Sequence, residues 1–483
     1  MAASIFTAEQ AQQWGLPLDE IEQLGNRLKS FYNRFRTSLC TKTRDCSNYG
    51  FDYLSGLLRI EAKRTMATIS RKTNRPYQNM HHFMSNSPWS GPGLILAIQN
   101  EIKQHAEYQA EAILVLDESA DEKAGDYSAG ASRQHNGRLG KVEMSQVGVF
   151  LSLATPRSHT WIDGELYIPE RWFGEAYAER RKKAGIPEDR VFKTKPELGW
   201  QMIQRAVLNQ VHFEAVVMDD LYGRNNVLRQ RLDGAGIEYY GDVPANTVVY
   251  LDKPQIVHPK TKRGKRSKRP KIVAKQRYEV RELVDHPSMN WVTITLRPNE
   301  RGMLTAQFAR RRVWTVHGTK CRQEWLLVRQ DDNRLTYVLS NAQSDTSLET
   351  MARRKSQRYL IERDNQDCKC ELGWDEFQAI KYHAWEHQLA LTILASWFIA
   401  ETRLDWMTRC ERDPALLDHY EVDVLPMLSV ANVRELLSAA MPLPQMSSQE
   451  AAALVIEHLV NRTRSRKSRL RKRRVSQTER RQT

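Results

Sequence analysis

The sequence predicts an α/β core with a β-rich insertion, an N-terminal helical domain, and a C-terminal helical region that ends in a basic tail. Two short apolar runs, AILVLD and AVVMD, are typical of buried strands and end at Asp117 and Asp219. Helical periodicity precedes the first run and returns after residue 346. Between Asp219 and residue 346, four further runs rich in β-branched and aromatic residues predict an insertion made of strands.

Residues 1–108 are predicted to form a helical domain. The segments EIEQLGNRLKSFYNRF and FDYLSGLLRIEAKRTMATIS repeat apolar residues at three- and four-residue intervals. The lysines and arginines of this domain are candidates for binding a polyanion. A solvated helix face is the competing interpretation for any single one of them.

Residues 109–251 are predicted to be the first part of the core. After the strand that ends at Asp117 come two more strands in QVGVFLSLAT and TWIDGELYIP, then a helix in PELGWQMIQRAVLNQ. The strand ending at Asp219 and a helix in NNVLRQRLDGAG follow. The glycines of this region match neither a Walker loop nor a GxGxxG fingerprint, so no nucleotide cofactor is expected.

The rest of the chain divides into four predicted parts. The insertion and its basic loop occupy residues 252–345, core helices that carry Glu362 occupy 346–402, a helical region occupies 403–461, and a basic tail, expected to be disordered, occupies 462–483. The longest apolar run, Leu389 to Ala400, is too short to cross a bilayer and predicts a buried helix.

The positive charge is concentrated in two segments. Of the formal net charge of +15, residues 462–481 carry +10 and residues 260–271 carry +8, which leaves about −3 for the remainder. Such basic appendages on a nearly neutral body indicate a polyanionic partner, because phosphates relieve their self-repulsion through counterion release. The six cysteines include no CxxC pair, and the first residues show no signal-peptide pattern, so a reducing, cytoplasmic or nucleoid location is predicted.

Three acidic residues form the candidate catalytic site. Asp117 and Asp219 end apolar strands, and on an ideal helix Lys355, Arg358 and Lys369 project within about 40° of Glu362. Two strand-end aspartates and a glutamate among phosphate-binding cations are what a two-metal phosphoryl-transfer site needs. Neighbouring acids leave alternatives open, because strand parity alone does not separate the members of two adjacent pairs, Asp117 with Glu118 and Asp219 with Asp220. Glu371 and Glu386 are weaker alternatives to Glu362, because they lack flanking cations at helical spacing.

Several segments between residues 110 and 400 together resemble a known family. They are LVLDES, SRQHNGRLGKVEMSQVGV, WIDGELYIPERW, RRKKAGIPED, VVMDDLYG, EWLLVRQ, YVLSNA, RYLIERDNQDCKCELGWDEF and HAWEHQLALTILA. Their order and number resemble bacterial insertion-sequence transposases of the DDE class, in the group with a Tyr-Arg-Glu-Lys signature, and most closely the type numbered seven-oh-one. Arg358 and Lys369 stand at the signature's arginine and lysine, whereas Lys355 replaces its tyrosine.

The resemblance implies a ribonuclease-H-like core with Asp117, Asp219 and Glu362 as a triad that binds two Mg²⁺ ions, for which Mn²⁺ substitutes. It implies cut-and-paste transposition on double-stranded DNA, both at the terminal inverted repeats of the element and at the target, by a homodimer. Trp291, Trp314 and Trp325 are candidates to receive a flipped base, and Trp314 is the preferred one because it follows three arginines. The predicted DNA-binding residues are Lys355, Arg358, Lys369, Lys262, Arg263, Lys265, Arg266, Arg310, Arg311, Arg312 and Trp314.

Two other functions remain as alternatives. One is a DNA-binding protein that descends from a transposase and has lost catalysis, and the other is a ribonuclease-H-like nuclease that cuts without joining strands. Metal-dependent cleavage separates the first from a transposase, and strand transfer separates the second.

Overall fold

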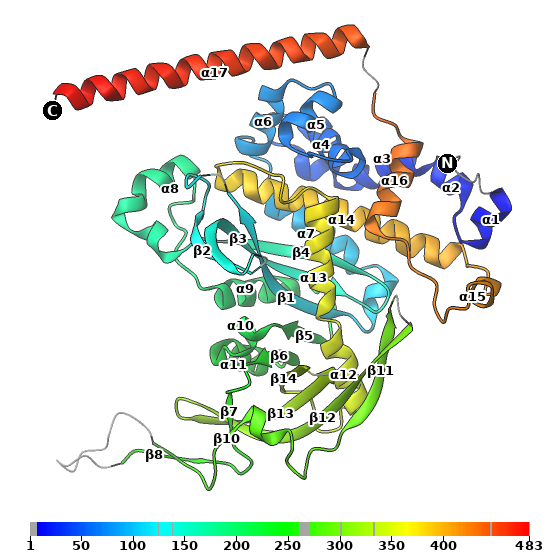
Figure 1. Cartoon of the computed structure of the whole chain (residues 1–483), viewed down its shortest axis with the longest axis vertical. Helices are drawn as coiled ribbons and strands as arrows, with labels where there is room; N and C mark the ends of the chain where they lie inside the picture. The colour runs from blue at the N-terminus through cyan, green and yellow to red at the C-terminus, as the bar shows by residue number, and fades with distance from the viewer. Residues whose placement is uncertain are drawn as a thin grey trace.

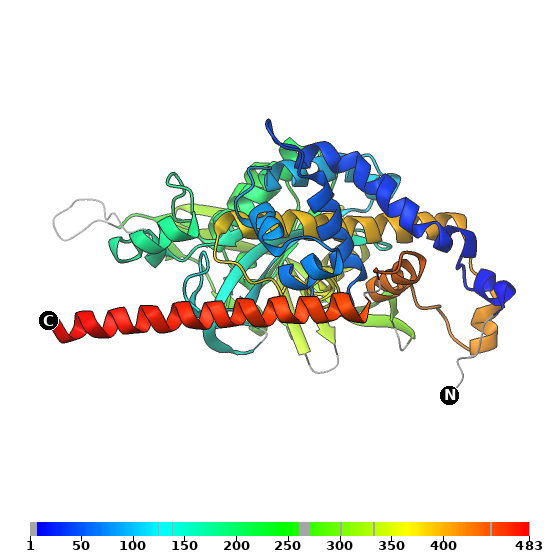
Figure 2. The same cartoon turned by 90° about the horizontal axis from the view of Figure 1, so that it is seen from above.

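The computed structural model describes residues 7–123, 125–137, 139–259, 271–299, 302–331, 334–444 and 447–482. Within these residues the centre of the molecule is a ten-stranded mixed sheet, covered by helices on both faces (Figures 1 and 2). The strand order is β11-β12-β13-β14-β6-β5-β1-β3-β2, with β4 also paired to β3. The β-rich segment is therefore continuous with the core sheet.

One half of the sheet is built around β1 (Ile113–Glu122). β3 (Lys141–Ala154) pairs antiparallel with β1 on one side, and both β2 (Ser132–Asn136) and β4 (His159–Tyr167) pair antiparallel with β3. On the other side β5 (Ala215–Met218) runs parallel to β1, and β6 (Tyr239–Val243) runs parallel to β5. β5 ends directly before Asp219, as predicted. β1 does not end at Asp117, because the residues from Asp117 to Glu122 stay paired with β3.

Long antiparallel strands extend the sheet beyond β6. β14 pairs with β6, and β13, β12 and β11 follow in hairpin order. The small strands β7 to β10 form two separate two-stranded sheets. The bounds of these strands are β7 (Val248–Val249), β8 (Gln255–Val257), β9 (Lys271–Val273), β10 (Tyr278–Glu279), β11 (Val292–Asn299), β12 (Gly302–His317), β13 (Lys320–Asp331) and β14 (Arg334–Ser340).

One face of the sheet carries most of the helices. Its largest apolar cluster joins the sheet, the N-terminal helices and α14 (Tyr382–Arg409), so the N-terminal helices share their core with the rest of the protein. α14 is apolar around most of its circumference, which explains its burial at the centre. None of the helices among the described residues is both long enough and apolar enough for a bilayer crossing. The other helices on this side are α1 (Ala8–Gln13), α2 (Leu18–Glu22), α3 (Leu24–Phe35), α4 (Ser47–Arg59), α5 (Met66–Lys72), α6 (Tyr77–Ser85), α7 (Gly91–Ile102), α9 (Lys195–Leu208) and α16 (Val430–Ala440).

The opposite face of the sheet is covered by α12 (Leu348–Ser356) and α13 (Tyr359–Gln366). Ile361 of α13 and Met351 of α12 are fully buried against β1, β5 and β6. This packing places the helix that carries Glu362 over the strands that carry the two aspartates. Short helices α8 (Ala178–Ala184), α10 (Asp220–Gly223), α11 (Asn226–Gly234) and α15 (Ala415–Tyr420) complete the fold apart from the C-terminal helix.

The basic tail differs from the prediction. Instead of a disordered segment, the structure has one long helix, α17 (Ser448–Gln482), which runs apart from the body of the molecule (Figure 1). The segment contains no glycine or proline and is rich in arginine, a good helix former, so local propensity accounts for the helix.

Candidate active site

Asp117 and Asp219 come together at one edge of the sheet. β1 and β5 are parallel and pair up to Leu116 and Met218, so the next residue of each strand is an aspartate at the same level. Carboxylate oxygens of Asp117, Glu118 and Asp219 all lie within 4.8 Å of one another. The structure therefore joins the two predicted aspartates and adds Glu118.

The structure also shows different surroundings for Asp117 and Glu118, the first pair of adjacent acids, which the sequence alone did not distinguish. Asp117 has the strand parity of Ile113 and Val115, which lie in the core under α12 and α13. Glu118 has the opposite parity and forms an ion pair of 2.9 Å with Lys195, the first residue of α9.

The second pair of acids is separated by the start of a helix. Asp219 caps α10, because its Oδ1 accepts hydrogen bonds from the backbone N–H of Leu221 at 3.0 Å and of Tyr222 at 3.3 Å. Asp220 is instead exposed. The capping bonds fix the orientation of the Asp219 carboxylate.

Repulsion and burial make this acidic cluster attract cations. Burial, together with the charges of Asp219 and Glu118, raises the pKa of Asp117 to about 8. Burial and the charge of Glu118 raise the pKa of Asp219 to about 6. A cation bound here relieves both effects, and hard oxygen donors at this spacing fit a divalent ion such as Mg²⁺.

Asp242 is a further acid at the site that the sequence analysis missed. It lies on β6, one strand beyond Asp219, and α10 packs so closely on this strand that a Cβ on Gly223 would stand 2.0 Å from the Asp242 carbonyl oxygen. Only glycine fits at Gly223, and the close approach brings the capped Asp219 next to β6. The signal available in the sequence was a polar residue two positions after the buried Tyr240, on a strand expected to neighbour the Asp219 strand.

Glu362 is connected to this edge through an arginine. The Arg358 Nη2 donates to Glu362 Oε1 at 2.5 Å, one turn along α13, and the Arg358 Nε lies 3.5 Å from Asp242 Oδ2. The Glu362 side chain is 55% exposed. Glu362 is outside the group of three close carboxylates, and the Arg358 guanidinium bridges it to Asp242 on the strand side.

The single helical face predicted around Glu362 is interrupted. α12 ends at Ser356, α13 begins at Tyr359, and the chain then forms a π turn at Asp367–Glu371, so an angle of 100° per residue does not hold across the segment. Arg358 meets Glu362 as predicted. Lys355 is instead buried against Asp242 at 2.8 Å, and Lys369 is buried against Asp121 at 2.9 Å.

The predicted DNA-binding residues of the insertion lie in several environments. Arg310 and Arg312 both stack on Trp325, with guanidinium carbons 4.3 and 4.2 Å from the ring centroid, whereas the intervening Arg311 points to the other face of the sheet. Trp314 instead lies beneath the Lys253 ammonium, 5.2 Å from its ring centroid. Of the predicted set, Lys262, Arg263, Lys265 and Arg266 are outside the described residues.

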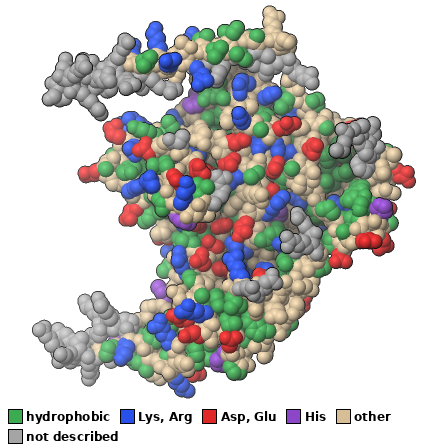
Figure 3. All heavy atoms as spheres, in the orientation of Figure 1, with side chains coloured by type: hydrophobic (Ala, Val, Ile, Leu, Met, Phe, Trp, Pro, Cys, Tyr) green, Lys and Arg blue, Asp and Glu red, His purple; other side chains and the backbone are tan. Residues whose placement is uncertain are grey.

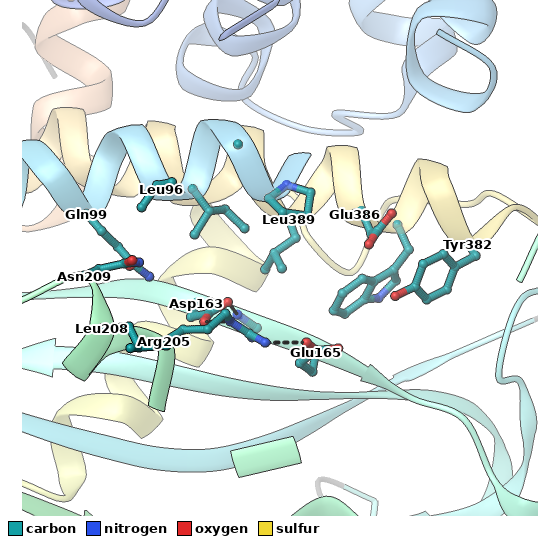
Figure 4. Close-up of a pocket in the computed structure, with 15 residues that line it drawn as sticks. Leu96, Gln99, Asp163, Glu165, Arg205, Leu208, Asn209, Tyr382, Glu386 and Leu389 are labelled. Carbon is teal, nitrogen blue, oxygen red and sulfur yellow. Dashed lines mark hydrogen bonds and ion pairs between the residues drawn. The ribbon is translucent and has the colours of Figure 1, made fainter. Parts of the chain in front are cut away.

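Acidic side chains gather in the middle of the face shown in Figure 3, beside lysines and arginines, where the helical part meets the β-rich part. A separate cavity of about 360 Å³ lies at the far edge of the sheet, between α7, α14 and β4 (Figure 4). There Arg205 binds Asp163 at 2.8 Å and Glu165 at 2.9 Å. These charges pair with one another, so the cavity differs from the acidic cluster, whose carboxylates face each other.

A cluster of half-buried carboxylates, carried by two adjacent parallel strands and next to basic side chains, defines a candidate metal-dependent hydrolase site. The comparisons with known proteins agree. The family model described as DDE superfamily endonuclease matches residues 34–303, more than half of the chain and a range that includes Asp117 and Asp219. The chain belongs to this family. It is also 25% identical over 341 residues to the probable transposase for insertion sequence element IS701 from Microchaete diplosiphon, which covers 69% of this chain and 77% of the relative. The family resemblance predicted from the sequence is confirmed.

Proposed function

We propose that this protein is a DNA transposase whose carboxylates Asp117, Asp219 and Glu362 hold two Mg²⁺ ions. The observation that carries the proposal is the placement of the two aspartates on adjacent parallel strands, with the helix of Glu362 packed on the same face. The match to DDE endonucleases and the similarity to an insertion-sequence transposase support it.

The topology supports the finer proposal of a ribonuclease-H-like core. Three antiparallel strands, β1, β3 and β4, are followed by α9 and then by β5 and β6, which continue the sheet in parallel with β1. This is the order of strands and helices expected from the sequence. In this proposal the insertion at residues 252–345 is interposed before the helix of Glu362.

Glu362 is preferred over Glu118 as the third ligand. Glu118 lies close to both aspartates, but Lys195 of α9 already binds its carboxylate at 2.9 Å. Glu362 is exposed, and its ion pair among the described residues is with Arg358, one helical turn earlier, so a rotation of its side chain costs few contacts. Its approach to the two aspartates would complete the oxygen donor set.

The chemistry follows from these positions. Mg²⁺ held by these carboxylates would lower the pKa of a water or a DNA 3′-hydroxyl and would stabilise the leaving oxygen. Asp219, fixed by its capping hydrogen bonds, sets the orientation of the donors. Arg358, with a planar fork of donors, holds a phosphate beside the scissile bond. Cleavage at the element ends and joining of the freed 3′-hydroxyl to target DNA would use the same site, which is cut-and-paste transposition.

Basic surfaces would hold the DNA backbone. The segment 260–271 and the helix α17 carry most of the net positive charge, and Arg310 and Arg312 add cations on the strand surface beside α12. Trp325, flanked by both arginines, replaces Trp314 as the preferred aromatic for stacking on a base. In this proposal the protein acts as a homodimer on two element ends in the bacterial cytoplasm.

Substitution of single carboxylates tests the proposal. We expect Mg²⁺- or Mn²⁺-dependent nicking and joining of DNA to be lost in Asp219→Asn and Glu362→Gln. Glu118→Gln should retain a measurable fraction of the wild-type rate, because Glu118 is engaged by Lys195. Loss in Glu118→Gln with retention in Glu362→Gln would assign the third ligand to Glu118 instead.

A further inference from the structure

Beside the site, the buried Lys355 and the half-buried Asp242 and Arg358 form a chain of charges that links β6 to α12 and α13. Lys355 Nζ lies 2.8 Å from Asp242 Oδ1, and Arg358 Nε lies 3.5 Å from Asp242 Oδ2. The Lys355 side chain is 6% exposed and that of Asp242 is 19% exposed. One carboxylate on the sheet therefore holds two cations, one from the end of α12 and one from the start of α13.

The same arginine also holds the third acid of the proposed triad. Its Nη2 binds Glu362 Oε1 at 2.5 Å while its Nε faces Asp242. A guanidinium has five N–H donors in a rigid plane, so a partner at Nε fixes the directions of the other four. Asp242 thus determines where the phosphate-binding end of Arg358 points.

We propose that Asp242, kept in place by Lys355, is a positioning residue that anchors Arg358 between the aspartate pair and Glu362. When Glu362 turns to a metal ion, Arg358 stays attached to β6 through Asp242, and its freed N–H groups face the phosphate next to the scissile bond. This inference rests on the proposed function, because it assumes that Glu362 is a metal ligand.

The anchor also accounts for lysine at the position where the transposase signature has tyrosine. A carboxylate with only a distant arginine partner would be costly to bury, and the short contact with Lys355 offsets that cost. A phenol carries no positive charge and would leave Asp242 without this partner. Lys355 therefore acts on the carboxylate Asp242 and not on DNA directly.

Without Asp242, Arg358 would pair with Glu362 alone, in competition with the metal. We expect Mn²⁺ affinity, measured by titration calorimetry on the full chain, to fall about tenfold in Asp242→Asn, the usual effect of losing a partner that orients a metal ligand. Because this variant leaves Lys355 buried without its carboxylate, the double variant Asp242→Asn/Lys355→Met is measured beside it. Neutral replacement of both partners commonly preserves stability.

A matched control comes from the other end of the sheet. Asp163→Asn breaks an ion pair of similar length between a buried carboxylate and the partly exposed Arg205, next to the cavity in Figure 4 and away from the acidic cluster. We expect it to lose thermal stability without losing Mn²⁺ affinity. An equal loss of affinity in this control would overturn the inference, because the effect of Asp242→Asn would then be general destabilisation.

Removal of Arg358 should not weaken Mn²⁺ binding, in contrast to Asp242→Asn. Arg358→Met releases Glu362, so Mn²⁺ should bind at least as tightly as in wild type, while the rate of DNA nicking falls. A double variant of Asp242 and Lys355 that folds, binds Mn²⁺ and nicks DNA like wild type would refute the positioning role. Wild-type protein that binds no Mn²⁺, or Glu362→Ala protein that binds it equally well, would instead refute the proposed function.

Discussion

Replacing Asp117 by asparagine should stabilise the metal-free protein while abolishing cleavage. In the folded protein the pKa of Asp117 is raised to about 8, by burial first and then by the charges of Asp219 and Glu118. In the unfolded chain the carboxyl has an ordinary pKa of about 4. Between these two values the folded state binds the extra proton, so the stability of the wild type falls as the pH rises.

The size of this loss of stability follows from the linkage between proton binding and folding. One proton contributes roughly 1.4 kcal/mol per pH unit, so wild type should lose roughly 2 to 3 kcal/mol between pH 5.5 and pH 7.5 through Asp117 alone. Asp117→Asn lacks this group, and its advantage in melting temperature should widen over this range by several degrees. The assay is thermal unfolding in EDTA at both pH values.

The increase in stability on addition of Mg²⁺ is the complementary measurement. Added Mg²⁺ at about 100 times its dissociation constant should stabilise wild type by about 2.7 kcal/mol and leave Asp117→Asn nearly unchanged. If the melting temperatures of Asp117→Asn and wild type change by the same amount from pH 5.5 to 7.5, the electrostatic account of the cluster is refuted. Equal stabilisation of both proteins by Mg²⁺ would exclude Asp117 as a metal ligand.

Three further predictions concern the rest of the molecule. Glu324 is fully buried among arginine, tyrosine and threonine side chains, so Glu324→Ala should lower the free energy of unfolding, measured in urea, by about 3 to 5 kcal/mol. Glu349→Ala, which removes an exposed ion pair, should lower it by under about 1 kcal/mol. Removal of residues 462–483 should lower the salt dependence of nonspecific DNA binding by several units of slope, and an unchanged slope would show that the tail does not contact phosphates. Trp325→Ala should weaken binding of a single-stranded oligonucleotide about tenfold and Trp314→Ala should weaken it less, with the reverse order contradicting the stacking assignment.

The strand-end aspartates were predictable because their signal is local. An apolar run followed by an acid indicates a buried strand, and two such runs on adjacent parallel strands bring their acids to the same level, although β1 continues past Asp117 to Glu122. The buried α14 was predictable for a similar reason, since ten of the twelve residues from Leu389 to Ala400 are apolar and none is charged.

The surroundings of Glu362 were less predictable because they depend on helix continuity and on distant partners. On a continuous α-helix with 100° per residue, Lys369 would lie on the same face as Glu362. The π turn changes this angle, and Lys369 instead pairs with Asp121 on β1. The role of Lys355 depends on Asp242, more than one hundred residues earlier in the chain, and no local pattern connects the two. The tail was predicted as disordered from its charge, whereas its helical propensity determines the structure found.

The most direct test of the central claim is nicking of supercoiled plasmid in Mg²⁺ or Mn²⁺ by wild type and by Glu362→Ala, purified identically and both shown to shift DNA on a gel. Plasmid nicking needs no knowledge of the element ends. The proposed triad predicts metal-dependent nicking by wild type and at least a hundredfold slower nicking by Glu362→Ala with unchanged DNA binding, since loss of a metal ligand removes the group that stabilises the transition state. Equal nicking by the two proteins would contradict the assignment of Glu362 and, with it, the proposed site.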